Sequence, residues 1–155
     1  MTSFVVSAVP ATELDRLRRA GRDDAGNPLQ PFTVTDPDSV PLRCCLRLAT
    51  VGEQAMLLAY RPPGTAGAYA EVGPVFVHAH PCAGYAEPNA YPAAYRARQQ
   101  VLRAYDAAGR IADATLVDGS TAEDGIARLL ADPAVTIVHS RNVLYGCYMF
   151  AIERA

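Results

Sequence analysis

The alternation of hydrophobic and polar positions predicts that strands dominate the chain and occur in groups. Short apolar or β-branched runs bounded by turn residues predict strands, and they cover residues 4–9, 43–48, 55–61, 74–80, 111–117, 135–139 and 147–153. A further short strand is expected at 32–35, inside a segment rich in Asp, Gly and Pro. The runs at 43–48, 55–61 and 74–80 predict an antiparallel core, and the last two runs predict a C-terminal hairpin.

Apolar residues at helical spacing predict about three helices between these groups. The first covers residues 12–20, where Thr12 has the position of an N-cap. The second and longest covers 92–108, because Pro92 suits the first helical position and the apolar residues after it recur on one side. The third begins at Thr121, with acidic residues in its first turn.

Length and composition indicate one domain, residues 1–155. The chain has 155 residues, of which 50% are hydrophobic, enough to bury a core of its own. Strands in groups with helices between them favour an α+β fold, an antiparallel-dominated sheet packed by about three helices. The formal net charge of −2 gives no electrostatic reason to bind nucleic acid or a membrane surface. No apolar run could span a bilayer and no export signal is evident, so we expect a cytoplasmic protein.

Four cysteines are present, and we interpret them as reduced thiols: Cys44, Cys45, Cys82 and Cys147. Cys44 and Cys45 are adjacent, and adjacent cysteines rarely bond each other. No CxxC pair occurs, so the motifs of a zinc ribbon and of a thioredoxin-like site are both missing.

The most informative segment is the end of the strand predicted at 74–80. Alternation places His78 and His80 on one face, and Cys82 follows in phase if the chain stays extended. These three side chains could bind zinc with a fourth ligand, although we commit to no metal. Alternatively, a histidine could lower the pKa of Cys82 and make it a nucleophile. The most common outcome for such residues is structural, with histidines bound to loop backbone and a buried cysteine.

A second polar group follows the strand predicted at 135–139. Arg141 could bind a carboxylate or phosphate through its guanidinium, with Asn142 orienting the anion. The alternative is a turn held by Asn and Ser side chains, with Arg141 paired to a surface acid. If the C-terminal hairpin lies beside the strand that carries His78, His139 and Arg141 would meet His78 and Cys82, and Tyr85 could wall the resulting pocket.

These residues support more than one function. The first is a small-molecule-binding or thiol-dependent protein, with Cys82 as nucleophile or redox thiol, His78 or His139 as base, and a small anion held by Arg141 and Asn142. The second is a non-catalytic interaction module in which Cys and His are structural. The third is a zinc site. No P-loop, dinucleotide-binding glycine turn, GxSxG or HExxH occurs, so we expect no cofactor, and enzymatic activity and oligomeric state stay open.

Several strings together resemble the bacterial family catalogued as domain of unknown function 1203. They are Cys44-Cys45-Leu46-Arg47, Gly52-Glu53 followed by Leu57 to Pro62, Gly73 to Ala79 with Cys82 and Tyr85, His139 to Asn142, and Gly146-Cys147-Tyr148. The resemblance implies a stand-alone small bacterial protein and carries no activity with it. The family pattern that the sequence resembles contains His78 and Cys82 more clearly than His80. The resemblance therefore favours a Cys82–His78 pair over a three-ligand metal site.

Overall fold

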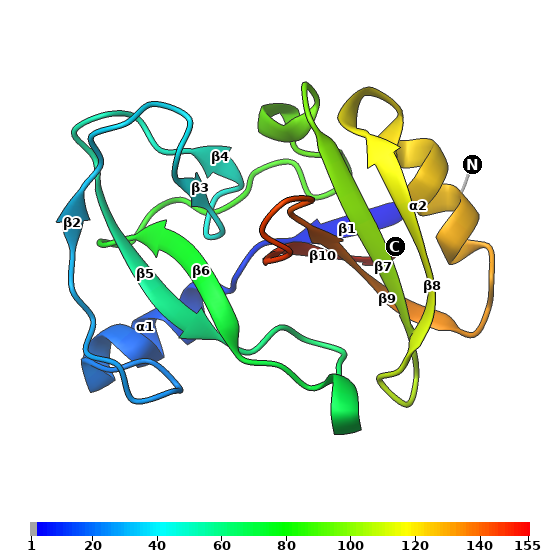
Figure 1. Ribbon diagram of the computed structural model, residues 1–155, viewed down its shortest axis with the longest axis horizontal. Helices are drawn as coiled ribbons and strands as arrows, with labels where there is room; N and C mark the ends of the chain where they lie inside the picture. Colours follow the sequence, from blue (N-terminus) through cyan, green and yellow to red (C-terminus); the bar gives the residue numbers. More distant parts are fainter. Residues whose placement is uncertain (1–2) are drawn as a thin grey trace.

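The computed structural model describes residues 3–155, which form two five-stranded sheets with two α-helices (Figure 1). The C-terminal sheet is antiparallel throughout and has the order β1 (Phe4–Ser7), β10 (Tyr148–Arg154), β9 (Val135–Arg141), β7 (Gln99–Asp106), β8 (Ile111–Asp118). The N-terminal sheet has the order β2 (Phe32–Thr33), β5 (Gln54–Tyr60), β6 (Gly73–His78), β3 (Pro41–Leu42), β4 (Arg47–Leu48). Within it only β3 and β6 pair in parallel.

Two hydrophobic clusters hold these layers together. One joins the N-terminal sheet and α1 (Ala11–Ala20) to side chains of the C-terminal sheet such as Tyr105 and Tyr148. The other lies between the C-terminal sheet and α2 (Ala122–Leu130), which covers the far face of that sheet in Figure 1. The two sheets therefore meet through apolar side chains. Neither helix is long and apolar enough to cross a membrane.

The expected α+β class is wrong, because the described chain is mostly β. The error lies in residues 92–108, where the structure has a 3₁₀ turn, η2 (Ala93–Tyr95), followed by β7. Burial in β7 alternates over Gln100, Leu102 and Ala104, with period two and not the helical period. Because β7 lies between β8 and β9 and pairs with both, the sheet pairing overrides the helical preference of residues such as Leu102 and Arg103.

The strand expected at 43–48 is also wrong. Residues 43–46 form a turn between the two-residue strands β3 and β4, closed by a hydrogen bond from Leu46 N to Leu42 O of 2.9 Å. Leu46 has a φ of 57°, a left-handed conformation that a bulky side chain rarely adopts. This turn, and not an extended strand, presents Cys44 and Cys45 to the rest of the molecule.

The remaining predicted elements are confirmed with shifted ends. Helix α1 begins at Ala11 with Pro10 as N-cap and no side-chain capping bond, so the capping role given to Thr12 is wrong. Strand β6 ends at His78, two residues earlier than expected. The short 3₁₀ turns η1 (Gly67–Tyr69) and η3 (Gly119–Thr121) complete the described structure.

Candidate metal centre

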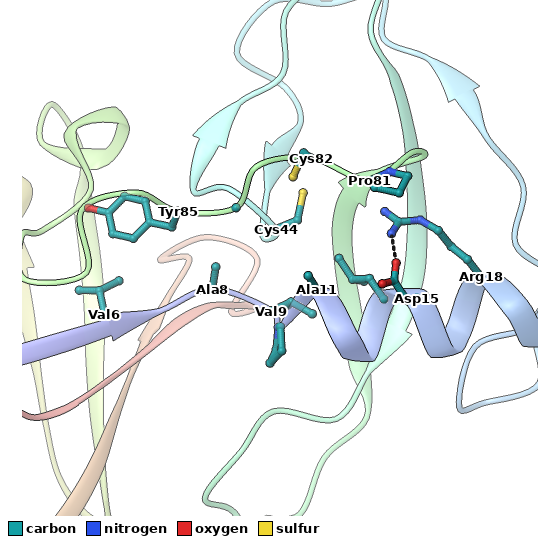
Figure 2. A pocket seen from close by; sticks show the side chains of 13 residues that line it. Val6, Ala8, Val9, Ala11, Asp15, Arg18, Cys44, Pro81, Cys82 and Tyr85 are labelled. Carbon is teal, nitrogen blue, oxygen red and sulfur yellow. Dashed lines mark hydrogen bonds and ion pairs between the residues drawn. The ribbon is translucent and has the colours of Figure 1, made fainter.

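Four side chains that can bind a metal converge beside the end of β6. They are Cys44, Cys45, His78 and Cys82, and their donor atoms all lie within 4.8 Å of one another. Because β3 runs parallel beside β6, the turn that follows β3 lies next to His78, the last residue of β6. The loop after β6 then folds back, and Figure 2 shows the sulfur atoms of Cys44 and Cys82 facing each other.

Two sulfur–nitrogen distances within this cluster are close to those of a tetrahedral zinc site. His78 Nδ1 lies 3.3 Å from Cys44 Sγ and 3.8 Å from Cys45 Sγ. With zinc–sulfur and zinc–nitrogen bonds of about 2.3 Å and 2.1 Å, a tetrahedron separates sulfur from nitrogen by about 3.6 Å. The set of three thiols and one imidazole is also a donor set that zinc favours.

The carboxylate of Glu53 orients the His78 imidazole, as carboxylates commonly do for histidines that bind zinc. His78 Nε2 lies 3.2 Å from Glu53 Oε1, and Glu53 is held by Arg47 at 2.6 and 2.9 Å and by the Thr50 N–H at 2.7 Å. These donors, Arg47 first, lower the pKa of Glu53 and keep it ionised. The Nε2–H of His78 donates a hydrogen bond to the ionised Glu53, which leaves the lone pair of Nδ1 directed at the sulfurs.

Arg47 and His78 share that carboxylate. Arg47 Nη2 also lies 3.2 Å from His78 Nε2, and in this tautomer both nitrogens carry hydrogen. We therefore interpret the contact between the two nitrogens as packing, with Glu53 accepting from each. The guanidinium also places a positive charge next to the thiols.

The three thiols differ in acidity. A hydrogen bond from the Cys44 thiol, together with the Arg47 backbone N–H and guanidinium, lowers the pKa of Cys45 against the effect of its burial. The same hydrogen bond and burial raise the pKa of Cys44, and burial raises the pKa of Cys82. Cys44 Sγ in addition accepts the His78 backbone N–H at 3.2 Å. Of these three thiols, Cys45 is therefore the one whose pKa is lowered.

The turn carries backbone strain that brings two adjacent cysteines to one point. In an extended strand Cys44 and Cys45 would face opposite sides, whereas in this turn both sulfurs lie within the cluster. The left-handed Leu46 that permits this costs roughly 1–2 kcal/mol. Leu46 is only 2% exposed, and its packing in the cluster beneath α2 stabilises the conformation.

Two cavities give access to the cluster from different sides. The first, of about 240 Å³, is lined by Cys44 and Cys82 and lies over α1, where Figure 2 shows Arg18 and Asp15. The second, of about 420 Å³, is lined by Cys45, His78 and Cys82. Tyr85 lines both cavities, and its hydroxyl donates to Ala90 O at 2.9 Å.

His80 is not part of the cluster. Strand β6 ends at His78, and the chain bends at Ala79 and His80 before Pro81, so the alternation that would align His80 with His78 does not continue. His80 is exposed to solvent. The expected set of His78, His80 and Cys82 is therefore wrong in one member. The structure groups His78 and Cys82 with Cys44 and Cys45, and leaves out His80.

The second predicted group does not join the first. His139 is 0% exposed, its Nε2 donates to Pro63 O at 2.7 Å, and the rings of Tyr105 and Tyr148 pack against it. Burial lowers its pKa to about 4, so it is neutral near pH 7. Arg141 binds Glu71 through both terminal nitrogens, at 2.6 and 2.8 Å.

Asn142 has a structural role in the same region. Its side-chain oxygen accepts the backbone N–H groups of Leu144 and Tyr145, which forms the turn between β9 and β10. The side chains of His139, Arg141 and Asn142 are thus engaged by the protein itself. None of them supplies a ligand atom to the cysteine cluster in residues 3–155.

The fold and the cluster define a small, mostly β protein with a Cys₃His donor set. The chain belongs to the family described as "Protein of unknown function (DUF1203)", whose model matches residues 39–154 and so confirms the resemblance. The matched range contains all four cluster residues. No curated protein and no solved structure matches this chain.

Proposed function

We propose that this protein binds one zinc ion through Cys44, Cys45, His78 and Cys82. The observation that carries the proposal is the convergence of four donor atoms within 4.8 Å, with Glu53 on the far nitrogen of the imidazole. Four protein ligands fill a tetrahedral zinc, which is typical of a structural site. The ion would tie the turn at 43–46 and the loop after β6 to the end of that strand.

The electrostatics of the site agree with zinc binding. Three thiolates and one neutral imidazole leave a zinc complex with a single negative charge, and Arg47 lies beside it. Without a metal, the raised pKa values of Cys44 and Cys82 keep these thiols protonated. In the zinc complex, the positive charge of the metal takes the place of these protons. Metal uptake therefore releases protons.

The test is metal content of protein purified without a histidine tag, measured by plasma mass spectrometry. We expect one zinc per chain in the wild type, and loss of most of it in Cys45→Ser, Cys82→Ser and His78→Ala. Cys147→Ser and His80→Ala are the matched controls, because each removes a potential ligand outside the cluster, and both should keep one zinc. Loss in a control equal to that in Cys82→Ser would contradict the proposal, as would absence of metal from the wild type.

Glu53→Gln tests the orienting role of the carboxylate separately. Glutamine keeps the size of the side chain but accepts a weaker hydrogen bond from His78. Zinc affinity, measured by competition with a chromophoric chelator, should fall about 10- to 100-fold while the stoichiometry stays at one. An unchanged affinity would show that Glu53 serves only Arg47 and Thr50.

A thiol-dependent site is the second candidate, and the lowered pKa of Cys45 favours it. In this alternative Cys45 is the reactive thiol, with His78 Nδ1 at 3.8 Å and the Cys44 thiol as its hydrogen-bond donor. Alkylation with iodoacetamide, read for each cysteine by peptide mass spectrometry, separates the two. A thiol site predicts fast modification of Cys45 in the purified protein, whereas zinc predicts protection of all three cysteines until a chelator is added.

The proposal includes a cytoplasmic location in a bacterium. Zinc binding requires reduced thiols, and the four cysteines are free in the structure. The resemblance to a bacterial family supports the source. Detection of a disulfide among these cysteines in protein taken directly from cells would contradict this part of the proposal.

A further inference from the structure

Arg43 is a buried cation at the boundary between the two sheets. It is 1% exposed, and its Nε donates to Tyr148 O at 2.8 Å. Its terminal nitrogens donate to Pro41 O at 2.6 Å and contact Cys147 Sγ at 3.1 Å. The side chain thus links the turn after β3 to the start of β10.

The charge of Arg43 has no carboxylate partner within residues 3–155. Guanidinium has five N–H donors, and the three contacts above use three of them. Burying a cation without an anion is strongly unfavourable, and proteins normally pair such groups. A negative charge from outside these contacts would therefore stabilise the side chain.

A cavity of about 510 Å³ adjoins this guanidinium, a size typical of small-molecule sites. Arg43 and Arg98 line it, and Arg98 forms no ion pair within the described residues. Its walls are mainly apolar, with Leu57 and Phe76 from the N-terminal sheet and Tyr145 from the turn between β9 and β10. The connecting segments contribute the polar or small residues Asp38, Ser39, Asn142 and Cys147.

Two of the wall residues are large apolar side chains that the rest of the protein leaves exposed. Leu57 is 52% exposed and Tyr145 is 84% exposed, although both are large. Asp38 is exposed and is the one acid among the lining residues, against two arginines. The cavity therefore offers positive charge at its base and apolar surface along its sides.

We propose that this cavity binds a small organic carboxylate with an apolar or aromatic body. The carboxylate accepts the two remaining N–H groups of Arg43 and is balanced by Arg98. The apolar body packs on Leu57, Phe76 and Tyr145. This site is separate from the zinc ligands, and it differs from the anion site expected at Arg141, whose guanidinium is already occupied by Glu71.

The probe for this site is phenylacetate, with phenylacetamide as its uncharged analogue of the same shape. Binding is followed by the Arg43 Nε–Hε resonance and the amides of residues 142–147 in proton–nitrogen correlation spectra. We expect saturable shifts with phenylacetate and at least tenfold weaker binding of phenylacetamide. Inorganic phosphate lacks the apolar body, and its higher negative charge is repelled more strongly by Asp38. It should therefore also bind at least tenfold more weakly than phenylacetate.

Variants locate the site without removing buried Arg43. Arg98→Gln removes one positive charge and Leu57→Glu places a carboxylate on the exposed wall, so each should weaken phenylacetate binding about tenfold or more. Arg110→Gln is the matched control, because it removes an exposed arginine from the turn between β7 and β8 and should bind like the wild type. Retained secondary structure in each variant is checked by circular dichroism.

Three results would overturn the proposal. One is equal binding of phenylacetate and phenylacetamide, and another is unchanged affinity in Leu57→Glu. The third is an Arg43 resonance that moves in Cys147→Ser but not on addition of phenylacetate. In that case a Cys147 thiolate supplies the negative charge, and the cavity has no need of an anion.

Discussion

Single residues in this protein carry chemistry that depends on their surroundings more than on their type. Three histidines are present, and each has a different environment: His78 faces three sulfurs, His80 faces solvent, and His139 is enclosed by tyrosine rings. Only His78 has both a carboxylate on one nitrogen and thiols near the other. Its neighbours, and not its place in a His-x-His pattern, make it a candidate metal ligand.

The buried His139 should make stability depend on pH. Its pKa of about 4 in the folded protein lies below the value of about 6.5 for an unfolded chain, so the unfolded chain takes up the proton first as pH falls. The contribution of His139 to the free energy of unfolding is fully present above about pH 6.5 and is lost as pH falls toward 4. By pH 4.5 the loss due to His139 should be about 2.5 kcal/mol.

Urea unfolding of wild type and His139→Asn between pH 8 and pH 4.5 measures this contribution. The free energy of unfolding should fall about 2.5 kcal/mol more for the wild type, because asparagine has no proton to take up. Any loss of zinc in acid affects both proteins and cancels in the comparison. Parallel pH curves for the two proteins would contradict the predicted pKa shift, and His80→Asn, which changes an exposed histidine, should follow the wild type.

At the level of the elements, most strands and both helices could be predicted from hydrophobic period, whereas β7 and the turn at residues 43–46 could not. Residues 99–106 contain Gln, Leu, Arg and Ala, which favour a helix locally. Their conformation is decided by pairing with β8 and β9 on both sides, which no short window of sequence contains. The same limit applies to the site, since Cys44 reaches His78 only through the parallel pairing of β3 with β6.

The candidate site was therefore only partly predictable. His78 and Cys82 are near each other along the chain, and the strand pattern predicts them together, although it also includes His80, which is exposed. The rule that adjacent cysteines seldom bond each other gives no reason to expect Cys44 and Cys45 in a site, because it concerns disulfides and not shared metal ions. The pairing of Glu53 with His78 depends on a turn and a strand register that the sequence pattern does not specify.

A close backbone contact between η2 and η3 should make Gly119 essential for stability. A Cβ added at Gly119 would lie 2.1 Å from Tyr95 O and 2.7 Å from Arg96 Cα. Both are backbone atoms, so relieving the clash requires a shift of the main chain. Gly119→Ala should therefore lower the free energy of unfolding by about 2–4 kcal/mol, measured by urea titration. Gly73→Ala is the control, because nothing lies within 4 Å of its added Cβ. Equal stability of the two variants would contradict this account.

At the scale of the whole molecule, adjacent residues of one short turn belong to the two proposed sites. Arg43 reaches β10 and lines the anion cavity, while Cys44 and Cys45 turn toward His78. The strained Leu46 conformation is held from one side by its own packing and, in our proposal, from the other by zinc. Removal of the metal should loosen the turn and with it the placement of the Arg43 guanidinium.

This arrangement predicts coupling between metal and anion binding. Phenylacetate affinity, measured by calorimetry, should fall about five- to tenfold when a chelator removes zinc, because part of the binding energy must then order the turn. Linkage requires the reverse effect, so saturating phenylacetate should raise zinc affinity by the same factor, and phenylacetamide should not. The metal-free protein must keep its dispersed amide spectrum for the comparison to hold. Equal phenylacetate affinity in both forms would mean that packing of Leu46 alone fixes the turn, and that the two sites act independently.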